Sequence, residues 1–155
     1  MNDIELLRQT FELARQSQLN GNLLFASILA DEKGNIIAKA ENTVVTNNDP
    51  LGHAEVNLLK NLPKSFDNQF LNSCTVYASH EPCAMCTAAM YWSGIGRLVY
   101  GLSNERFYTI VGESQKAVGL TLPCRTLLAT GGRKVEVVGP LIEDEAAEWY
   151  RRYWK

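Results

Sequence analysis

The sequence predicts an α/β fold built on one mixed five-stranded sheet with helices on both faces. An apolar run at residues 23–30 and a strand pattern at 36–42 are separated by the turn sequence D-E-K-G-N, which indicates an antiparallel hairpin. Further along, strand patterns at 74–79 and 97–102 flank a helical pattern. A strand–helix–strand unit of this kind indicates parallel pairing through a crossover connection.

Size and composition fit a single globular domain, residues 1–155. The chain is 46% hydrophobic and 21% charged, and its net charge of −2 gives no electrostatic footprint for nucleic acid or an anionic membrane. No apolar run approaches the ~20 residues of a membrane span, and no signal peptide is apparent. Four cysteines without a secretion signal favour thiol or metal chemistry, so we expect a cytoplasmic protein.

The N-terminal half begins with an amphipathic helix at residues 2–17, which Asn2 or Asp3 can cap. After the hairpin, a polar loop at 44–49 leads to a second helix. We expect Asp49 to cap this helix and Pro50 to occupy its first position. The helix would hold His53 and end at Leu62-Pro63, followed by a linking loop at 64–72.

In the C-terminal half, the central strand is followed at Pro82 by a helix that Gly94-Ile95-Gly96 closes. Residues 103–119 are ambiguous, with a short helix at 113–117 as one interpretation, and residues 120–130 fit a strand or a helix. A strand at 134–138 and a helix at 143–154 complete the chain.

Four residues form a chemical motif, H-x-E at His53 and Glu55 and P-C-x-x-C at Cys83 and Cys86. Cysteines at i and i+3 lie on one helix face and can bind one metal ion. Together with His53 they give three protein ligands and one open position, the arrangement of catalytic zinc sites. Glu55 would act as the proton shuttle.

One geometric condition applies to this motif. Residues two apart on a regular helix point ~200° away from each other. His53 and Glu55 can therefore share one site only if the metal lies off the end of their helix, and a start at Pro50 would place both near that end.

Other interpretations of these residues stay open. Cys83 and Cys86 could be two buried thiols, or part of a structural zinc site completed by Cys74 or His80, although that would leave Glu55 without a role. We expect Cys74 and Cys124 to be ordinary core thiols. A non-catalytic, zinc-stabilised binding module is the rival from another functional class.

The pattern H-x-E … P-C-x-x-C, with a strand leading into it, resembles the zinc-dependent cytidine/deoxycytidylate deaminase superfamily. The resemblance implies the three-layer α/β/α cytidine deaminase-like fold, one Zn²⁺ per chain and a homodimer. The stretch at residues 41–56 and A-M-Y-W at 89–92 are similar to bacterial guanine deaminases. Residues 134–147 look more like tRNA adenosine deaminases.

The resemblance also implies substrate contacts. The position of Asn42 contacts substrate in both branches, Phe25 matches an aromatic position that can stack on a base, and Ala54 and Trp92 complete the predicted set. The chain departs from the family at 23–27, where L-L-F-A-S replaces a P-F-G-A stretch. Core packing for Phe25, core or dimer interface for Trp92, and turn chemistry for Asn42 are the alternatives.

The sequence therefore predicts a zinc-dependent hydrolase that deaminates a free nucleobase or nucleoside, with a guanine-like aminopurine or related heterocycle first and a role in purine metabolism. A tRNA-specific adenosine deaminase is the first rival. The C-terminal Y-R-R-Y-W-K could contact RNA, but helix-dipole complementarity explains its charges as well. Five acidic residues could read the edge of guanine: Glu81, Glu105, Glu113, Glu143 and Asp144.

Overall fold

The computed structural model describes residues 2–155. Its centre is one five-stranded sheet in the order β2-β1-β3-β4-β5. β1 pairs antiparallel with β2 and β3, whereas β3, β4 and β5 are parallel. The strands are β1 Ala26–Ala30, β2 Ile36–Glu41, β3 Thr75–His80, β4 Arg97–Leu102 and β5 Glu136–Val138. The predicted mixed sheet, its hairpin and its parallel crossover are confirmed.

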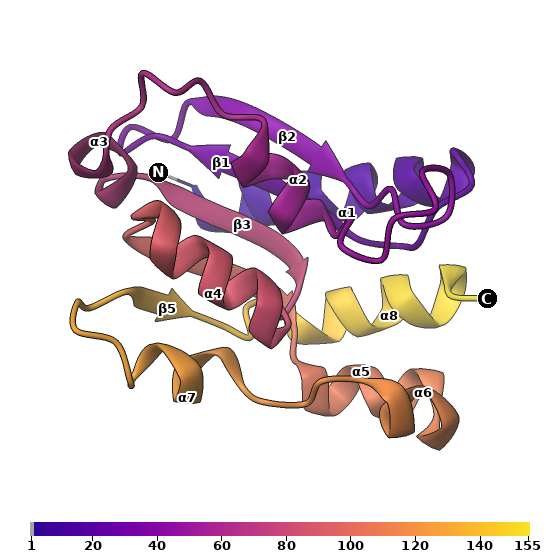
Figure 1. The fold of residues 1–155 in the computed structure, drawn as a ribbon. Helices are drawn as coiled ribbons and strands as arrows, with labels where there is room; N and C mark the ends of the chain where they lie inside the picture. Colours follow the sequence, from indigo (N-terminus) through magenta and orange to yellow (C-terminus); the bar gives the residue numbers. More distant parts are fainter. Residues whose placement is uncertain (1) are drawn as a thin grey trace.

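Helices cover both faces of the sheet (Figure 1). α1 and α8 pack on one face, and α2 and α4 on the other. The helices are α1 Asp3–Leu19, α2 Ala54–Lys60, α3 Asn68–Asn72, α4 Ala84–Ser93, α5 Asn104–Val111, α6 Glu113–Val118, α7 Cys124–Leu128 and α8 Glu143–Tyr153. The expected three-layer α/β/α architecture is confirmed. Within residues 2–155, no helix combines the length and apolarity needed to span a membrane.

Strand alternation divides the apolar side chains between two cores. In β3, Tyr77 faces α1 and α8, whereas its neighbours Val76 and Ala78 face α2 and α4. β4 repeats the pattern, with Val99 in the first core and Leu98 in the second. Successive strand side chains point to opposite faces, so a strand covered on both sides is apolar at every position.

The second helix begins later than the sequence predicts. α2 starts at Ala54, not at Pro50, and His53 is the residue immediately before its first turn. The Asp49 side chain accepts a hydrogen bond from the Leu51 amide two residues on, so Asp49 closes a turn instead of capping the helix. This shift frees His53 from helical geometry, and it removes the 200° restriction between His53 and Glu55.

Three other boundaries differ from expectation. β1 begins at Ala26 instead of residue 23. The predicted linking loop at 64–72 contains α3, whose first turn Asp67 caps by accepting from the Phe70 amide. The ambiguous stretch at 103–130 holds three short helices, α5, α6 and α7. Each has too few residues for a periodic pattern to stand out.

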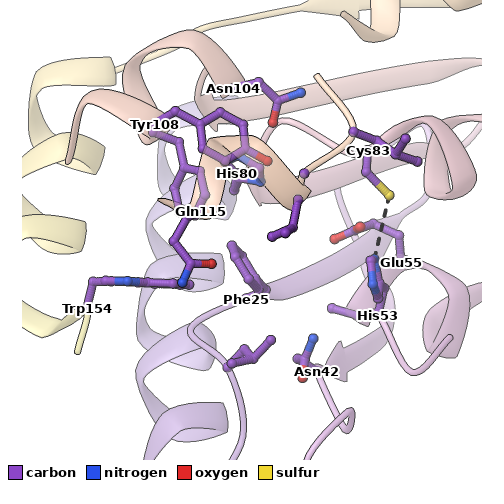
Figure 2. A pocket seen from close by; sticks show the side chains of 16 residues that line it. Phe25, Asn42, His53, Glu55, His80, Cys83, Asn104, Tyr108, Gln115 and Trp154 are labelled. Carbon is purple, nitrogen blue, oxygen red and sulfur yellow. Dashed lines mark hydrogen bonds between the residues drawn. The ribbon is translucent and has the colours of Figure 1, made fainter. Parts of the chain in front are cut away.

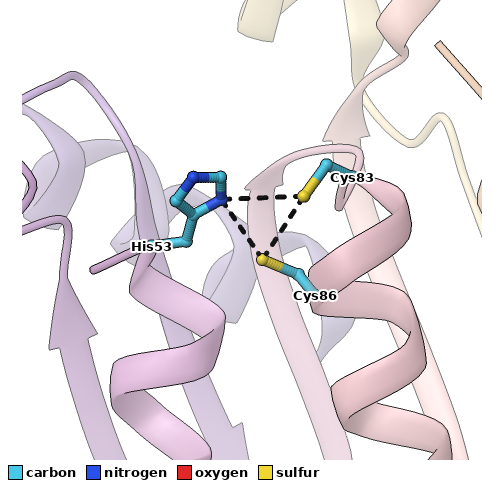
Figure 3. Close-up of side chains that lie close together, drawn as sticks. All are labelled: His53, Cys83 and Cys86. Carbon is cyan, nitrogen blue, oxygen red and sulfur yellow. Dashed lines mark hydrogen bonds between the residues drawn. The ribbon is translucent and has the colours of Figure 1, made fainter. Parts of the chain in front are cut away.

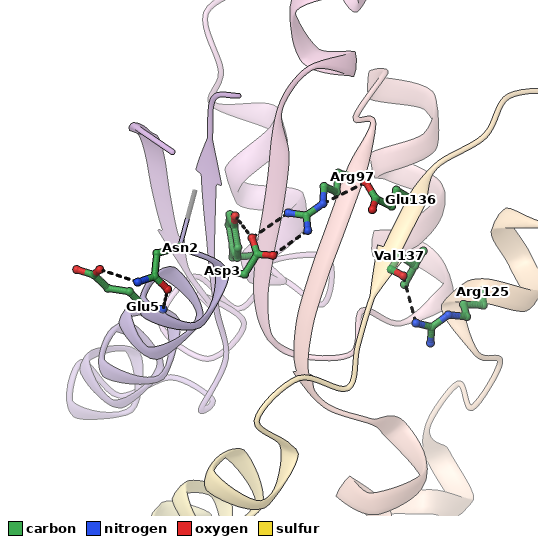
Figure 4. A network of polar contacts seen from close by, with 8 residues as sticks. Asn2, Asp3, Glu5, Arg97, Arg125, Glu136 and Val137 are labelled. Carbon is green, nitrogen blue, oxygen red and sulfur yellow. Dashed lines mark hydrogen bonds and ion pairs between the residues drawn. The ribbon is translucent and has the colours of Figure 1, made fainter. Parts of the chain in front are cut away.

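A charged network joins the start of α1 to the starts of β4 and β5 (Figure 4). Arg97, at the start of β4, donates to both carboxylate oxygens of Asp3 at 2.9 and 2.8 Å. Its Nε lies 3.2 Å from the carboxylate of Glu136 on β5. Arg125 on α7 donates to the carbonyl oxygen of Val137, which holds α7 against the edge strand. The contacts among Asp3, Arg97 and Glu136 lie at the amino ends of β4 and β5, opposite the strand ends where the motif residues lie, so they support the scaffold and not the site.

Candidate active site

His53, Cys83 and Cys86 converge beyond the carboxyl end of β3 (Figure 3). The His53 Nδ1 atom lies 3.6 Å from Cys83 Sγ and 3.4 Å from Cys86 Sγ, and the two sulfur atoms are 3.7 Å apart. Among the described residues, these three form the one cluster of metal-ligand types whose donor atoms all lie within 4.8 Å of one another. The alternative fourth ligands Cys74 and His80 are not part of it.

Helix starts position all three side chains. His53 precedes α2, Cys83 precedes α4, and Cys86 lies in the first turn of α4. The free N–H groups and the dipole at the start of α4 favour anionic sulfur. At its other end, α4 stops at Gly94, whose φ of 94° is a left-handed conformation that glycine adopts without a steric penalty.

The donor atoms fit a tetrahedral zinc ion. Tetrahedral bonds of ~2.3 Å to sulfur and ~2.0 Å to nitrogen place ligand atoms about 3.5–3.8 Å apart. The three separations here are 3.4, 3.6 and 3.7 Å. Two sulfur atoms and one imidazole nitrogen are also ligand types that zinc prefers.

The cluster favours thiolate already in the protein itself. Hydrogen bonding from Cys86, followed by that from His53, lowers the pKa of the Cys83 thiol to about 4. The same contact raises the pKa of Cys86, because a second thiolate beside the first is unfavourable. The Cys83 contact raises the pKa of His53. Cys83 is therefore held as the thiolate, the form in which a cysteine binds a metal ion.

Glu55 lies beside this cluster and is almost fully buried, with 7% of its surface exposed. Burial raises the pKa of its carboxyl to about 7, against a smaller lowering by the Cys86 hydrogen bond. A carboxyl with a pKa near neutrality can both accept and release a proton. It is not one of the three clustered ligands, so it is free for that role.

A cavity of about 340 Å³ opens over Glu55 and the cluster (Figure 2). Four aromatic rings form much of its wall: Phe25, Phe107, Tyr108 and Trp154. Its polar lining, apart from the motif residues, is uncharged and comprises Asn42, His80, Asn104 and Gln115. The cavity matches a flat, apolar-faced ligand with a few hydrogen-bonding groups.

Three of the four predicted substrate contacts line this cavity. Phe25 lies immediately before β1. Its ring packs against other aromatic rings, with its centroid 5.7 Å from the Trp154 ring centroid. Asn42 is buried, and its side-chain oxygen accepts from the Val44 amide, which leaves its NH₂ group as a donor. Ala54 lines the same wall and is 1% exposed.

Trp92 is not brought to this cavity within the chain. It lies on the outer surface of α4 and is 81% exposed. Trp92 lines a small groove together with Ala88 and Tyr91 of the same helix and Leu127 of α7. Core packing of Trp92 is therefore wrong in this chain. The other alternative, a dimer interface, is compatible with its exposed position.

Six polar or aromatic side chains line the cavity without having been predicted there from the sequence: His80, Asn104, Phe107, Tyr108, Gln115 and Trp154. Asn104 and Tyr108 are four apart on α5 and share a face. The aromatic C-terminal segment draws attention to Trp154, but Trp154 reaches the cavity only because α8 folds back across the molecule. No local pattern reports such a distant contact.

Glu81 fixes the elements that carry these residues. Its buried carboxylate accepts from the backbone amides of Asn104 and Cys124 at 3.0 and 2.9 Å. It thereby joins the end of β3 to the first residues of α5 and α7. Both of its oxygens are occupied by the protein, so Glu81 is not available to read a base.

Comparison with known proteins identifies the family. The model described as "Cytidine and deoxycytidylate deaminase zinc-binding region" matches residues 1–102. The chain belongs to this family. Its members are hydrolytic deaminases that bind zinc, and His53, Cys83 and Cys86 are the residues positioned to hold the ion here.

Curated relatives include several kinds of deaminase. A protein of Schizosaccharomyces pombe named "Probable cytosine deaminase" is 37% identical over 98% of this chain and 92% of its own length. The tRNA-specific adenosine deaminase of Haemophilus influenzae is 36% identical over 67% of this chain and 60% of its own. The guanine deaminase of Bacillus subtilis is 41% identical over 44% of each chain.

Solved structures share the fold. A guanine deaminase from Nitrosomonas europaea superposes with a TM-score of 0.77 at 26% identity, covering 96% of this chain and 82% of that one. The Bacillus subtilis guanine deaminase gives a TM-score of 0.62 at 25% identity, covering 100% and 96%. The predicted cytidine deaminase-like fold and the predicted relationship to the guanine and tRNA adenosine deaminase branch are confirmed.

Proposed function

We propose that the protein deaminates a free nucleobase by hydrolysis, replacing an exocyclic amine with an oxo group and releasing ammonia. The observation that carries the proposal is the position of Glu55. Its buried carboxyl lies beside a three-ligand zinc cluster and opens into a cavity of about 340 Å³ with aromatic walls. A free base with its ring faces covered by aromatic side chains fits such a space.

The zinc ion, held by His53, Cys83 and Cys86, would supply Lewis-acid activation of water at neutral pH. Glu55 takes the proton that the attacking water loses and delivers it to the ring nitrogen beside the amine-bearing carbon. It then carries the second proton to the departing ammonia. Burial raises the pKa of Glu55, which suits a carboxyl that must both accept and release a proton.

The other cavity residues would orient the base. Phe25 offers a ring against which the base stacks, and Asn42 offers a free NH₂ donor to an acceptor on its edge. Ala54, between His53 and Glu55, keeps the floor of the cavity shallow enough for the reacting carbon to approach.

A carboxylate in the cavity could accept hydrogen bonds from the N–H edge of guanine, so the positions of the acidic residues help to decide which base is bound. Among the described residues that line the cavity, Glu55 is the one carboxylate. Glu81 holds two backbone amides, while Glu143 and Asp144 pair with Arg106. No second carboxylate is thus placed to read the N–H edge of guanine. We therefore propose cytosine-type bases as candidate substrates beside a guanine-like aminopurine; deamination of the aminopurine would be a step of purine metabolism.

The test is ammonia release by the zinc-loaded protein. The panel contains cytosine, guanine, adenine, their nucleosides and a tRNA anticodon stem-loop. Release from one or more free bases supports the proposal and identifies the substrate. Release from the stem-loop alone would favour a tRNA adenosine deaminase, and zinc retention without any turnover would favour the non-catalytic module.

We further propose a homodimer that works in the cytoplasm. The exposed Trp92 and the groove of about 270 Å³ beside it form an apolar surface suited to a second copy. All four cysteines are free thiols, which suits a reducing compartment. Sedimentation analysis of the wild type and of Trp92→Asp tests the dimer. A mass of one chain for the wild type would contradict it.

A further inference from the structure

Two side chains in the cavity carry buried nitrogen atoms that lack hydrogen-bond partners. They are His80, at its Nε2 atom, and Asn104, at its Nδ2 atom. Both residues line the cavity over Glu55. Leaving a buried polar atom unpaired costs roughly 1–3 kcal/mol, and folded proteins rarely tolerate it without a reason. Two such atoms at the wall of one cavity indicate a ligand that pairs with them.

The backbone and neighbouring rings hold both residues in place. His80 ends β3, and its ring packs 4.4 Å from the Phe107 centroid and 5.3 Å from that of Phe25. Asn104 begins α5, and its main-chain amide is bound by Glu81. Their side chains therefore cannot turn to solvent without disturbing the packing around them. Figure 2 shows them on the side of the cavity opposite Asn42.

We propose that His80 and Asn104 determine substrate specificity by hydrogen-bonding the edge of the base that lies away from its reacting amine. This inference rests on the proposed deaminase function and adds the chemistry of the substrate. The two side chains would recognise a carbonyl oxygen next to a ring N–H group on the side away from the reacting amine, as in 4-amino-2-oxopyrimidines such as cytosine. In guanine, the N–H beside the carbonyl is bonded to the amine-bearing carbon itself.

The donor and acceptor pattern supports this class. A neutral imidazole presents one donor and one acceptor, and a carboxamide presents both kinds of group. Together they complement a carbonyl and an N–H side by side. Burial lowers the pKa of His80 to about 3, so its imidazole is uncharged at neutral pH. The uncharged His80 and Asn104 side chains favour an uncharged ligand edge, because a buried charge without a partner would be costly in this cavity.

Because the two nitrogen atoms are unpaired in the free protein, replacing these side chains should affect stability and binding in opposite ways. The Nδ2 atom of Asn104 is buried without a partner, so replacing the amide with an apolar side chain of the same shape removes the desolvation cost of that atom. Asn104→Leu should therefore keep or raise the melting temperature while weakening the base contact. If instead Asn104 and His80 served only to hold the fold, the same replacement would lower the melting temperature and leave substrate recognition unchanged.

The experiment compares Asn104→Leu and His80→Leu with the wild type, using cytosine and guanine as substrates. Asn47→Leu, an exposed amide in the 44–49 loop, is the matched control. We expect KM for cytosine to rise ~10-fold or more in both cavity variants, with a smaller change in kcat, full zinc content and no loss of melting temperature. Unchanged KM, or a KM change matched by a fall in melting temperature, would overturn the proposal.

A second measurement separates this inference from the proposed function. Zinc-loaded Glu55→Gln is titrated with cytosine and with uracil, and binding is followed by the rise in melting temperature. The same titration is repeated with Asn104→Leu added. Binding that Asn104→Leu abolishes supports the recognition edge even if no ammonia is ever released. Binding that persists, or no binding to the parent protein, would overturn it whatever the activity assays show.

Discussion

At the scale of single residues, Glu55 is the group on which the proposed chemistry depends. We predict that Glu55→Gln keeps the fold and the zinc content, since Glu55 is not among the clustered ligands. Turnover should fall by ~10²-fold or more, because the proton shuttle is lost. Metal analysis, circular dichroism and ammonia release measure the three outcomes. Turnover near the wild-type rate would show that another group moves the protons.

Cys83 gives a second prediction. Cys83→Ala removes one of three zinc ligands, so zinc content and melting temperature should fall together, because metal binding energy contributes to folding. Cys124→Ala is the control, since Cys124 is buried outside the cluster and can lower only stability. Full zinc occupancy in Cys83→Ala would exclude Cys83 as a ligand.

The sequence predicted the zinc cluster because its residues lie in short motifs whose spacing has a chemical meaning. Asn42, Phe25 and Ala54 followed from family resemblance, and the structure places all three at the cavity. His80 and Asn104 could not be predicted as a pair. They come from different elements, and only the parallel pairing of β3 with β4 brings those strand ends together.

At the scale of helices and strands, Glu81 joins three segments. We predict that Glu81→Gln destabilises the protein by ~1–3 kcal/mol, because an amide has one acceptor oxygen where two backbone N–H groups need partners. KM should also rise, since α5 carries the cavity residues Asn104 and Tyr108. Urea unfolding and kinetics measure both effects. The exposed Glu105→Gln serves as control, and equal stability of the two variants would refute the role of Glu81.

The Asp3–Arg97 pair predicts a pH dependence. Hydrogen bonding from Arg97 is the main cause that lowers the Asp3 pKa in the folded protein. A lowered pKa adds stability above the unfolded pKa of ~3.9, and this stability is lost as pH falls through the folded value. Asp3→Asn should therefore be less stable than wild type at pH 7, by about 1 kcal/mol or less.

The difference in unfolding free energy between wild type and Asp3→Asn should shrink as the pH falls below ~4. Urea titrations across this range, with Glu105→Gln again as control, measure it. A difference that stayed constant down to low pH would show that the ionised carboxylate is not the source of the stabilisation.

Element boundaries were predictable where the signal is local. β4 spans the predicted residues 97–102, because an apolar run follows a glycine stop. α2 was predicted four residues early, since Asp49-Pro50 is also a good turn sequence. α5 and α7 begin at backbone amides that the distant Glu81 binds, and no neighbouring residue reports that contact.

At the scale of the whole molecule, sheet topology explains where the site lies. β3 and β4 run parallel, so the segments that follow them leave from one edge of the sheet. Cys83 and Asn104 follow within three residues of those strand ends, and the start of α2 brings His53 and Glu55 to the same edge. Open α/β sheets place their ligands at this edge. Residues of α6 and Trp154 complete the wall of the cavity.

The most direct test of the account is ammonia release by the zinc-loaded protein with cytosine, guanine and the tRNA anticodon stem-loop compared side by side. We predict release from a free base, with cytosine turned over at a higher kcat/KM than guanine, and none from the stem-loop. Release from the stem-loop alone, or from no compound in the panel despite full zinc occupancy, would contradict the central claim that this cavity deaminates free nucleobases.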